Sequence, residues 1–321
     1  MTMIDLSIII VSWNAREFLS KCLWSLKTSM TDYYTEIIVV DNASTDGSQE
    51  LVRDQFPRVN LICNDTNLGF AKAINIGVSH CRGKYVCLIN SDVEVLEDCF
   101  VRMIAYMEHH PEVGMLGPQI IDPNGNIQRS CMGFPTLWNT FCRALALDSL
   151  FPKVKLFGGY LMTYWEHNTM RNVDVINGCF WMIKREALDQ VGLLDEQFFI
   201  YAEDLDWCKR FTMADWEIVY FPMAEALHYG GASSSNAPVR FYIEMQKANL
   251  KFWRKHYGRF SYSVYYAINV LHHSLRVLGY SIHSVLRPQK SKDGSYKILR
   301  SISSIKVLLG VNKDRLSYDQ G

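Results

Sequence analysis

The chain has 321 residues and a formal net charge of zero, with 33 Lys and Arg against 33 Asp and Glu. Hydrophobic residues make up 49% and charged residues 21%, which is typical of a globular protein. This length suits one large α/β domain, or one domain with an appendage. No run of about 20 uninterrupted apolar residues occurs, so we expect no membrane span. The first residues show no basic flank followed by a long apolar core, so we expect no secretory signal.

The neutral total hides an uneven distribution of charge. Residues 1–250 hold 20 Lys and Arg against 30 Asp and Glu, whereas residues 251–321 hold 13 against 3. We therefore expect the basic tail either to meet an anionic partner or to pack on the acidic body. The nine cysteines lack CxxC and zinc-site spacing, which indicates reduced thiols and a cytoplasmic protein.

Apolar runs alternate with helical patterns through the first hundred residues. Strands are expected at residues 6–11, 36–40, 59–63 and 85–89, with helices between them. This order predicts a doubly wound sheet, which binds ligands at the carboxyl ends of its strands. Polar clusters follow each expected strand, at residues 12–14, 41–42, 64–67 and 90–92. A single Asp after a strand is usually a turn or a helix cap, but four such clusters favour a binding site.

The second half of the chain is less regular. We expect a helix at residues 93–107, strands at 114–121, within 173–183 and at 217–221, and a short helix at 186–191. Residues 131–172 are aromatic-rich and irregular. Glu203, Asp204 and Asp206 begin another helix, where the helix dipole alone would favour acidic residues. His228 follows the last strand and precedes a glycine-containing loop at 230–233 that could close over a substrate.

Carboxylates at strand ends need a partner for their charge, and a nucleotide diphosphate with a divalent cation supplies one. Asp41 could accept hydrogen bonds from a base or ribose, and Asp92 could hold Mg²⁺ or Mn²⁺, which prefer oxygen ligands. His228 could complete the metal shell or contact the diphosphate. Asp204 could remove a proton from an acceptor hydroxyl, with Glu203 as the competing candidate.

One apolar stripe runs along the tail. Its members are Val264, Ile268, Leu271, Leu275, Leu278, Ile282 and Val285, and a weaker stripe follows in residues 299–309. The first stripe could pack on the catalytic domain or on a second subunit. It could instead lie in a membrane interface over residues 264–315, with Lys290, Lys292, Lys297 and Arg300 near anionic lipid.

Six segments, taken together, resemble a known family. They are SIIIVSWNARE (7–17), VVDNASTDGS (39–48), NLGFAKAINIG (67–77), LINSDVEV (88–95), NGCFWMIKREALDQVGLLDEQFFIYAEDLDWCKR (177–210) and HYGGAS (228–233). In order and spacing they are similar to the family 2 glycosyltransferases of the GT-A fold, close to the rhamnosyltransferase-like branch. The resemblance implies a Rossmann-like, doubly wound mixed sheet with a helical C-terminal extension.

The resemblance also implies a role for each matching residue. Donor-binding residues would be Ser12, Asn14, Asp41, Asn42, Asn67, Lys72, Ser91 and Asp92. Asp92 would hold the cation together with His228, and Asp204 would be the general base beside Glu203. One displacement would then invert the anomeric carbon, with the cation stabilising the leaving group. The motif reads Asn90-Ser91-Asp92 rather than Asp-x-Asp, so a single carboxylate remains for the cation.

These expectations define a domain plan and a function. Residues 1–257 would form the catalytic domain, divided into a nucleotide-binding half (1–120) and an acceptor-binding half (121–257), and residues 258–321 a basic helical tail. The enzyme would move a sugar, such as L-rhamnose from dTDP-rhamnose, to a cell-surface glycan or polyprenyl-linked acceptor. UDP- and GDP-sugars are alternative donors, and no nucleic-acid partner is expected. The competing functions are a nucleotidyltransferase and a non-catalytic sugar-binding protein.

Overall fold

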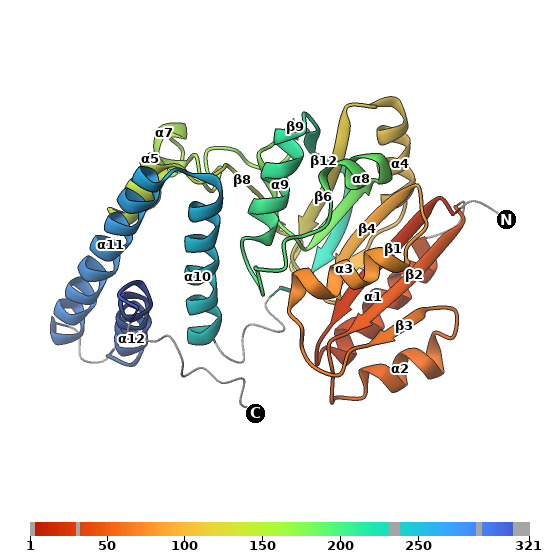
Figure 1. Ribbon diagram of the computed structural model, residues 1–321, viewed down its shortest axis with the longest axis horizontal. Helices are drawn as coiled ribbons and strands as arrows, with labels where there is room; N and C mark the ends of the chain where they lie inside the picture. Colours follow the sequence, from red (N-terminus) through yellow and green to blue (C-terminus); the bar gives the residue numbers. More distant parts are fainter. Residues whose placement is uncertain (1–3, 30–32, 231–237, 287–290, 311–321) are drawn as a thin grey trace. The chain divides into compact units, whose positions relative to one another are not determined.

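The computed structural model describes residues 4–29, 33–230, 238–286 and 291–310 (Figure 1). The chain divides into two compact units. Unit 1 comprises Met1–Phe134 and Tyr160–Asn236, and unit 2 comprises Pro135–Gly159 and Ala237–Gly321. The domain boundary that we expect after residue 257 stays a prediction.

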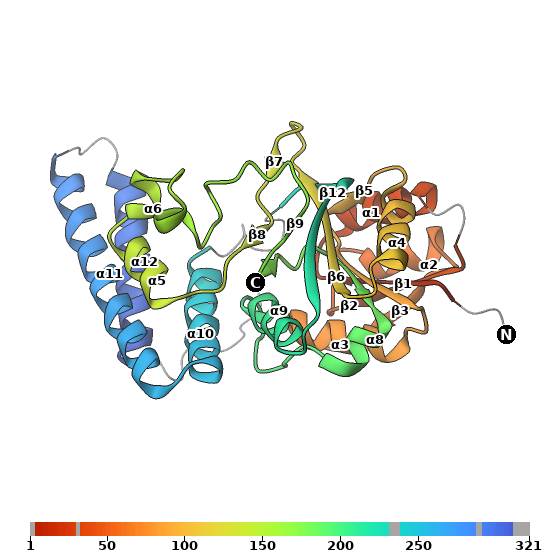
Figure 2. The ribbon, with the colours of Figure 1, turned by 90° about the horizontal axis from the view of Figure 1, so that it is seen from above.

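The amino-terminal part of unit 1 contains four parallel strands in the order β3-β2-β1-β4. They are β1 (Leu6–Ser12), β2 (Thr35–Asp41), β3 (Asn60–Cys63) and β4 (Tyr85–Asn90), joined through α1 (Arg16–Ser29), α2 (Ser48–Gln55) and α3 (Phe70–His80). The β-branched run in β1 is buried because helices cover both faces of the sheet. Figure 2 shows α1 on one face and α3 on the other.

The remaining strands turn this parallel sheet into a mixed one, in the continued order β4-β11-β6-β12-β5. They are β5 (Val93–Val95), β6 (Val113–Ile121), β11 (Phe180–Lys184) and β12 (Glu217–His228), with α4 (Cys99–His109), α8 (Arg185–Val191) and α9 (Glu203–Met213) packed beside them. β7 (Ile127–Gln128) and β9 (Arg171–Asn172) extend the sheet, and β8 (Cys131–Met132) pairs with β10 (Val175–Ile176). The predicted doubly wound mixed sheet is confirmed.

Two sequence predictions for local structure are wrong in this region. The helix expected over residues 93–107 begins only at Cys99, because Val93–Val95 pairs antiparallel with the end of β12. The strand expected at 217–221 continues to His228 past an irregularity after Phe221. The longer β12 brings His228 opposite Val93, next to the carboxyl end of β4.

The described secondary-structure elements of unit 2 are helices, and the expected helical C-terminal region is confirmed. The segment expected to be irregular supplies α5 (Leu137–Ala144), α6 (Leu147–Leu150) and α7 (Lys155–Gly158). The C-terminal part supplies α10 (Pro238–His256), α11 (Arg259–Leu286) and α12 (Ser291–Leu308), and α11 packs against both α5 and α12. Lys290, residues 311–315 and the side chain of Lys292 lie outside the described residues. Among the described helices, none has the length and apolar character needed to cross a membrane.

Candidate active site

Ser12 and Asp41 form a buried polar pair at the carboxyl ends of β1 and β2. They are register partners in neighbouring parallel strands, so their side chains point to the same face of the sheet. Asp41 Oδ1 accepts hydrogen bonds from Ser44 N at 2.9 Å and Gln49 Nε2 at 2.7 Å. Among the described residues, Asp41 Oδ2 and Ser12 Oγ have no hydrogen-bond partner. Because such buried atoms are costly when unpaired, this pair is suited to meet a polar ligand or water.

Asn14 and Asn42 use their side chains to hold the surrounding loops. Asn14 Oδ1 accepts from Thr45 N at 2.8 Å, which joins the loops after β1 and β2. Asn42 Nδ2 donates to Gly69 O at 3.2 Å, and Asn42 Oδ1 accepts from Asn64 Nδ2 at 2.9 Å. Both residues therefore shape the rim around Asp41, and their direct contact with a donor stays a prediction.

The loop before α3 is tied to the segment that precedes α9. Phe70 N donates to Phe199 O at 2.8 Å, and Asn67 Oδ1 accepts from Gly69 N at 2.9 Å. Gly69 has a φ of +84°, and a Cβ there would lie 2.5 Å from Phe199 O, so only glycine allows this approach. Lys72 is exposed on the first turn of α3. The contact connects the predicted donor loop to the chain leading into Glu203 and Asp204.

Asn75 makes a second connection between these regions. Its side chain is buried on α3, donates to Leu194 O at 2.9 Å and to Glu196 Oε1 at 3.0 Å, and accepts from Leu194 N at 3.1 Å. Our sequence reasoning missed this role. The signal available was an Asn on the apolar face of a helix, at a position that a core residue would normally occupy.

Asp92 and His228 lie next to each other. Asp92 Oδ1 lies 3.3 Å from His228 Nε2, and Tyr229 N donates to Asp92 O at 3.0 Å. Ser91 is buried beside Asp92 between β4 and β5. Residues 231–233 of the expected glycine-containing loop lie outside the described residues.

Gln128 determines how His228 presents its ring. Gln128 Nε2 donates to His228 O at 2.7 Å, which fixes the amide orientation and leaves Oε1 as the acceptor 3.0 Å from His228 Nδ1. His228 Nδ1 must then carry a proton, which leaves Nε2 as the ring nitrogen directed at Asp92. A carboxylate oxygen and an imidazole nitrogen at this distance suit a shared cation. No group of three or more His, Cys, Asp or Glu side chains arranged to hold a metal occurs in the part of the chain that the structure describes.

The three acids at the start of α9 have different environments. Asp206 is fully buried and its Oδ2 pairs with Arg210 Nε at 2.9 Å, which assigns it to packing. Burial raises the pKa of Asp204 to about 6. Burial and then the charge of Asp204 raise the pKa of Glu203 to about 8, and Glu203 Oε2 has no hydrogen-bond partner among the described residues. Asp204 is half-buried whereas Glu203 is buried, so Asp204 is the more accessible of the two to an acceptor hydroxyl.

The charges of Asp92 and Asp204 both act on Cys179. Burial, followed by the negative charge of Asp92 and more weakly that of Asp204, raises the pKa of the Cys179 thiol to about 12. Cys179 O also accepts a hydrogen bond from Asn90 N at 2.9 Å, at the end of β4. Trp181 and Trp207 are buried and pack edge to face with ring centroids 5.5 Å apart, so both belong to the core rather than to a sugar-stacking surface.

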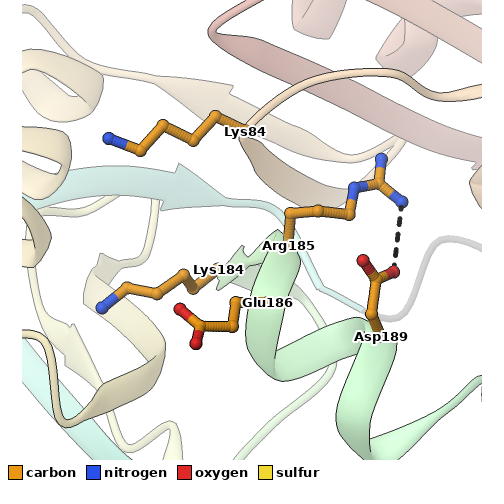
Figure 3. Close-up of a pocket in the computed structure, with 5 residues that line it drawn as sticks. All are labelled: Lys84, Lys184, Arg185, Glu186 and Asp189. Atoms are coloured by element: carbon orange, nitrogen blue, oxygen red, sulfur yellow. Dashed lines mark ion pairs between the residues drawn. The ribbon is translucent and has the colours of Figure 1, made fainter.

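A charged hollow lies at the other end of β4 and is drawn in Figure 3. It is lined by Lys84, Lys184, Arg185, Glu186 and Asp189. Its cations already have protein partners, because Lys84 Nζ lies 2.6 Å from Glu108 Oε1 and Lys184 Nζ donates to Pro111 O at 2.9 Å. Arg185 pairs with Asp189 at 4.0 Å, as the dashed line in Figure 3 marks. These pairs explain the hollow as a structural cluster.

Comparison with known proteins agrees with this geometry. The model of the family "Glycosyl transferase family 2" matches residues 7–192. The chain is 28% identical over 245 residues to N-acetylglucosaminyl-diphospho-decaprenol L-rhamnosyltransferase of Mycobacterium tuberculosis, covering 73% of this chain and 79% of that protein. It is 24% identical over 260 residues to dTDP-rhamnosyl transferase RfbF of Shigella flexneri, covering 77% and 80%.

A solved structure shares the fold. The mannosyltransferase PcManGT from Pyrobaculum calidifontis, in complex with GDP-Man and Mn²⁺, superposes with a TM-score of 0.55 at 15% identity, covering 95% of this chain and 88% of that one. The predicted GT-A fold is confirmed by this likeness.

Proposed function

Because this chain belongs to glycosyl transferase family 2, we propose that it transfers L-rhamnose from dTDP-rhamnose to a lipid-linked sugar acceptor, with inversion at the anomeric carbon. The choice of sugar and acceptor follows the two rhamnosyltransferases that resemble the chain over most of its length. The proposal rests on one observation of this chain, which is the Asp92–His228 pair beyond the carboxyl end of β4.

The nucleotide part of the donor would bind at Asp41 and Ser12. A carboxylate only accepts hydrogen bonds, so the open Asp41 Oδ2 suits a ribose hydroxyl or an N–H of the base. Ser12 Oγ lies on the same face and offers one donor and further acceptor capacity. Asn14 and Asn42 would keep the rim of this pocket in place through their bonds to neighbouring loops.

The diphosphate would lie beyond the end of β4. Asp92 Oδ1 and His228 Nε2 would hold Mg²⁺ or Mn²⁺, and their 3.3 Å separation and the orientation imposed by Gln128 fit such an ion. When bound, the ion neutralises charge that develops on the departing nucleoside diphosphate. Ser91 lies in the same turn, and Lys72 on α3 is an exposed cation available to a phosphate.

Proton removal from the acceptor hydroxyl would fall to Asp204. Burial raises the pKa of Asp204, which makes it a stronger base than an ordinary Asp. Burial and the charge of Asp204 raise the pKa of Glu203 as well, and Glu203 is the less accessible of the two acids. The acceptor would approach from the α9 side, opposite the face on which the leaving group departs.

Other functions are less well supported. Membership of a glycosyltransferase family argues against a nucleotidyltransferase, and the retained carboxylates Asp41, Asp92 and Asp204 argue against a non-catalytic sugar-binding protein. UDP- and GDP-sugars remain the alternative donors. A lipid-linked acceptor would require the enzyme to work at the inner face of the plasma membrane as a peripheral protein.

A donor panel tests the proposal. Thermal shift and donor hydrolysis are measured with dTDP-, UDP- and GDP-sugars, each with and without Mn²⁺. We expect dTDP-rhamnose with Mn²⁺ to give the largest stabilisation and the fastest hydrolysis. A larger response to another nucleotide sugar would overturn the choice of donor, and no response to any would overturn the function.

A further inference from the structure

The long helix α11 exposes an apolar stripe. Leu271, Leu275, Leu278 and Ile282 are 45%, 40%, 59% and 52% exposed, although they form one continuous stripe at spacings of four, three and four residues. A helix of a water-soluble protein normally turns such a stripe towards its core. The stripe predicted from the sequence therefore exists, and within unit 2 it points outward.

The opposite face of α11 is polar and buried. Asn269 and His273 lie there, and the ring nitrogens of His273 have no hydrogen-bond partner among the described residues. Burial lowers the pKa of His273 to about 4, so this histidine is neutral and adds no charge to the interior. The helix thus buries these polar groups, together with the ring of Tyr265, and exposes the leucines and the isoleucine of its stripe.

The partner helix α12 repeats this arrangement. It buries Ser301 and Ser304 and exposes Leu299 and Ile302. Besides these serines α12 buries Leu308 near its end, and α11 and α12 pack against each other, so two adjoining helices both carry exposed leucine and isoleucine side chains on the outside. Exposed apolar patches of this kind mark an interaction surface.

A third segment of the same unit adds to the exposed apolar area. Trp138, Leu150 and Leu156 are exposed on and next to α5–α7, and α5 packs against α11. Tyr257 Oη donates to Pro135 O at 2.6 Å, so this inserted segment is joined to the C-terminal helices. Unit 2 therefore carries exposed apolar side chains on both of the segments that form it.

The positive charge of the C-terminal helices indicates the kind of partner that this apolar surface would bind. Helix α11 has no acidic residue, and residues 251–321 hold 13 Lys and Arg against 3 Asp and Glu. An apolar surface on a basic unit matches the interface of an anionic lipid bilayer, which offers acyl chains and negatively charged headgroups together. A second copy of the chain would bring the same positive charge to the contact and is disfavoured for that reason.

We propose that the outward stripe of α11, with the exposed apolar residues of α12 and α5–α7, docks unit 2 on an anionic membrane surface. This inference rests on the proposed function, because docking would bring the enzyme to the surface at which a lipid-linked acceptor is presented. Helix α11 would lie in the interface rather than cross it, which agrees with the absence of a spanning helix among the described residues.

Vesicle flotation of the full-length protein tests this surface. The vesicles contain phosphatidylcholine alone or phosphatidylcholine with phosphatidylglycerol. The test variant is Leu275→Gln/Leu278→Gln, and the matched control is Leu193→Gln/Met213→Gln, which changes two side chains of unit 1 that are 46% and 70% exposed. Circular dichroism and dTDP binding show whether each variant is folded and keeps its nucleotide site.

We expect the wild type and the control to float with the anionic vesicles, more weakly at high salt. Removing two half-exposed leucines should reduce partitioning roughly tenfold or more while dTDP binding is unchanged. Equal flotation of the test variant and the wild type would overturn the proposal. It would also be overturned if the wild type did not float with either kind of vesicle and if, in sedimentation, the wild type were a dimer and the test variant a monomer. Loss of dTDP binding in the wild type would contradict the proposed donor without affecting the flotation result.

Discussion

Asp41 gives the sharpest separation between a binding role and a structural role. Replacing it by Asn keeps the size of the side chain. Asp41 Oδ1 receives hydrogen bonds from Ser44 N and Gln49 Nε2, so the oxygen of the substituted amide must occupy that position. The amide NH₂ group then takes the position of Oδ2, which faces no described protein atom as a hydrogen-bond partner. The protein keeps both hydrogen bonds to this side chain. A nucleotide whose N–H or O–H group points at this position, however, meets the NH₂ group of the amide, and no hydrogen bond can form.

The expected loss is that of one hydrogen bond to a charged group. Such a bond contributes about 1.5–3 kcal/mol, which corresponds to roughly a 10- to 100-fold weaker affinity. Isothermal titration calorimetry with dTDP at fixed Mn²⁺ measures the affinity, and urea unfolding measures the stability. We expect the free energy of unfolding to change by less than ~1 kcal/mol, because the amide oxygen of the Asp41→Asn variant still accepts both hydrogen bonds.

Asp46 supplies the matched control in the same loop. Its Oδ2 accepts from Arg16 N at 2.8 Å and its Oδ1 accepts from Ser48 N at 3.1 Å, so Asp46→Asn must place an NH₂ group against a backbone N–H. We expect this variant to lose about 1–3 kcal/mol of stability. The reasoning is refuted if Asp41→Asn binds dTDP as tightly as the wild type, or if it is as destabilised as Asp46→Asn.

Three further variants test other parts of the site. Glu203→Gln should stabilise the fold above about pH 5. The pKa of Glu203 is about 8 in the folded protein against a usual 4.5, so the wild-type fold loses stability relative to the unfolded chain as the pH rises between these two values. Unfolding midpoints at pH 5 and pH 8 measure this, and a gain equal at both values would contradict it. Gln128→Leu should weaken Mn²⁺ binding about 10- to 100-fold by releasing the His228 ring, which calorimetry with Mn²⁺ and dTDP detects; unchanged affinity would exclude this orienting role. Gly69→Ala should cost about 1–3 kcal/mol of stability and weaken dTDP binding, because its Cβ would lie 2.5 Å from Phe199 O; a normal unfolding midpoint would refute the close contact.

The sheet and the polar residues at the carboxyl ends of its strands were predictable from the sequence because their signals are local. The runs at residues 6–11 and 36–40 are apolar and β-branched, so they identify buried strands without knowledge of their neighbours. Asp41 and Asp92 follow such strands directly, which predicts their position at one edge. The family resemblance added the roles that local patterns do not contain.

Long-range contacts explain what the sequence did not reveal. Residues 93–95 form a strand only because β12 pairs with them, more than a hundred residues later in the chain. Gln128 and Asn75 act through hydrogen bonds to His228 and to Leu194, and neither sequence separation nor periodicity indicates these partners. The outward direction of the α11 stripe was also open, because amphipathic spacing gives a stripe but not the medium that it faces.

The most direct measurement of the central claim compares single-turnover sugar transfer by the wild type and Asp204→Asn, using radiolabelled dTDP-rhamnose, Mn²⁺ and a lipid-linked sugar acceptor. The dTDP affinity of both proteins is measured in parallel. We predict that the wild type transfers the sugar, at a rate that rises through about pH 6 as Asp204 ionises, and that Asp204→Asn binds dTDP normally but is slower by at least about 100-fold. Transfer by Asp204→Asn at the wild-type rate, or a wild-type rate that falls through this pH range, would contradict the account.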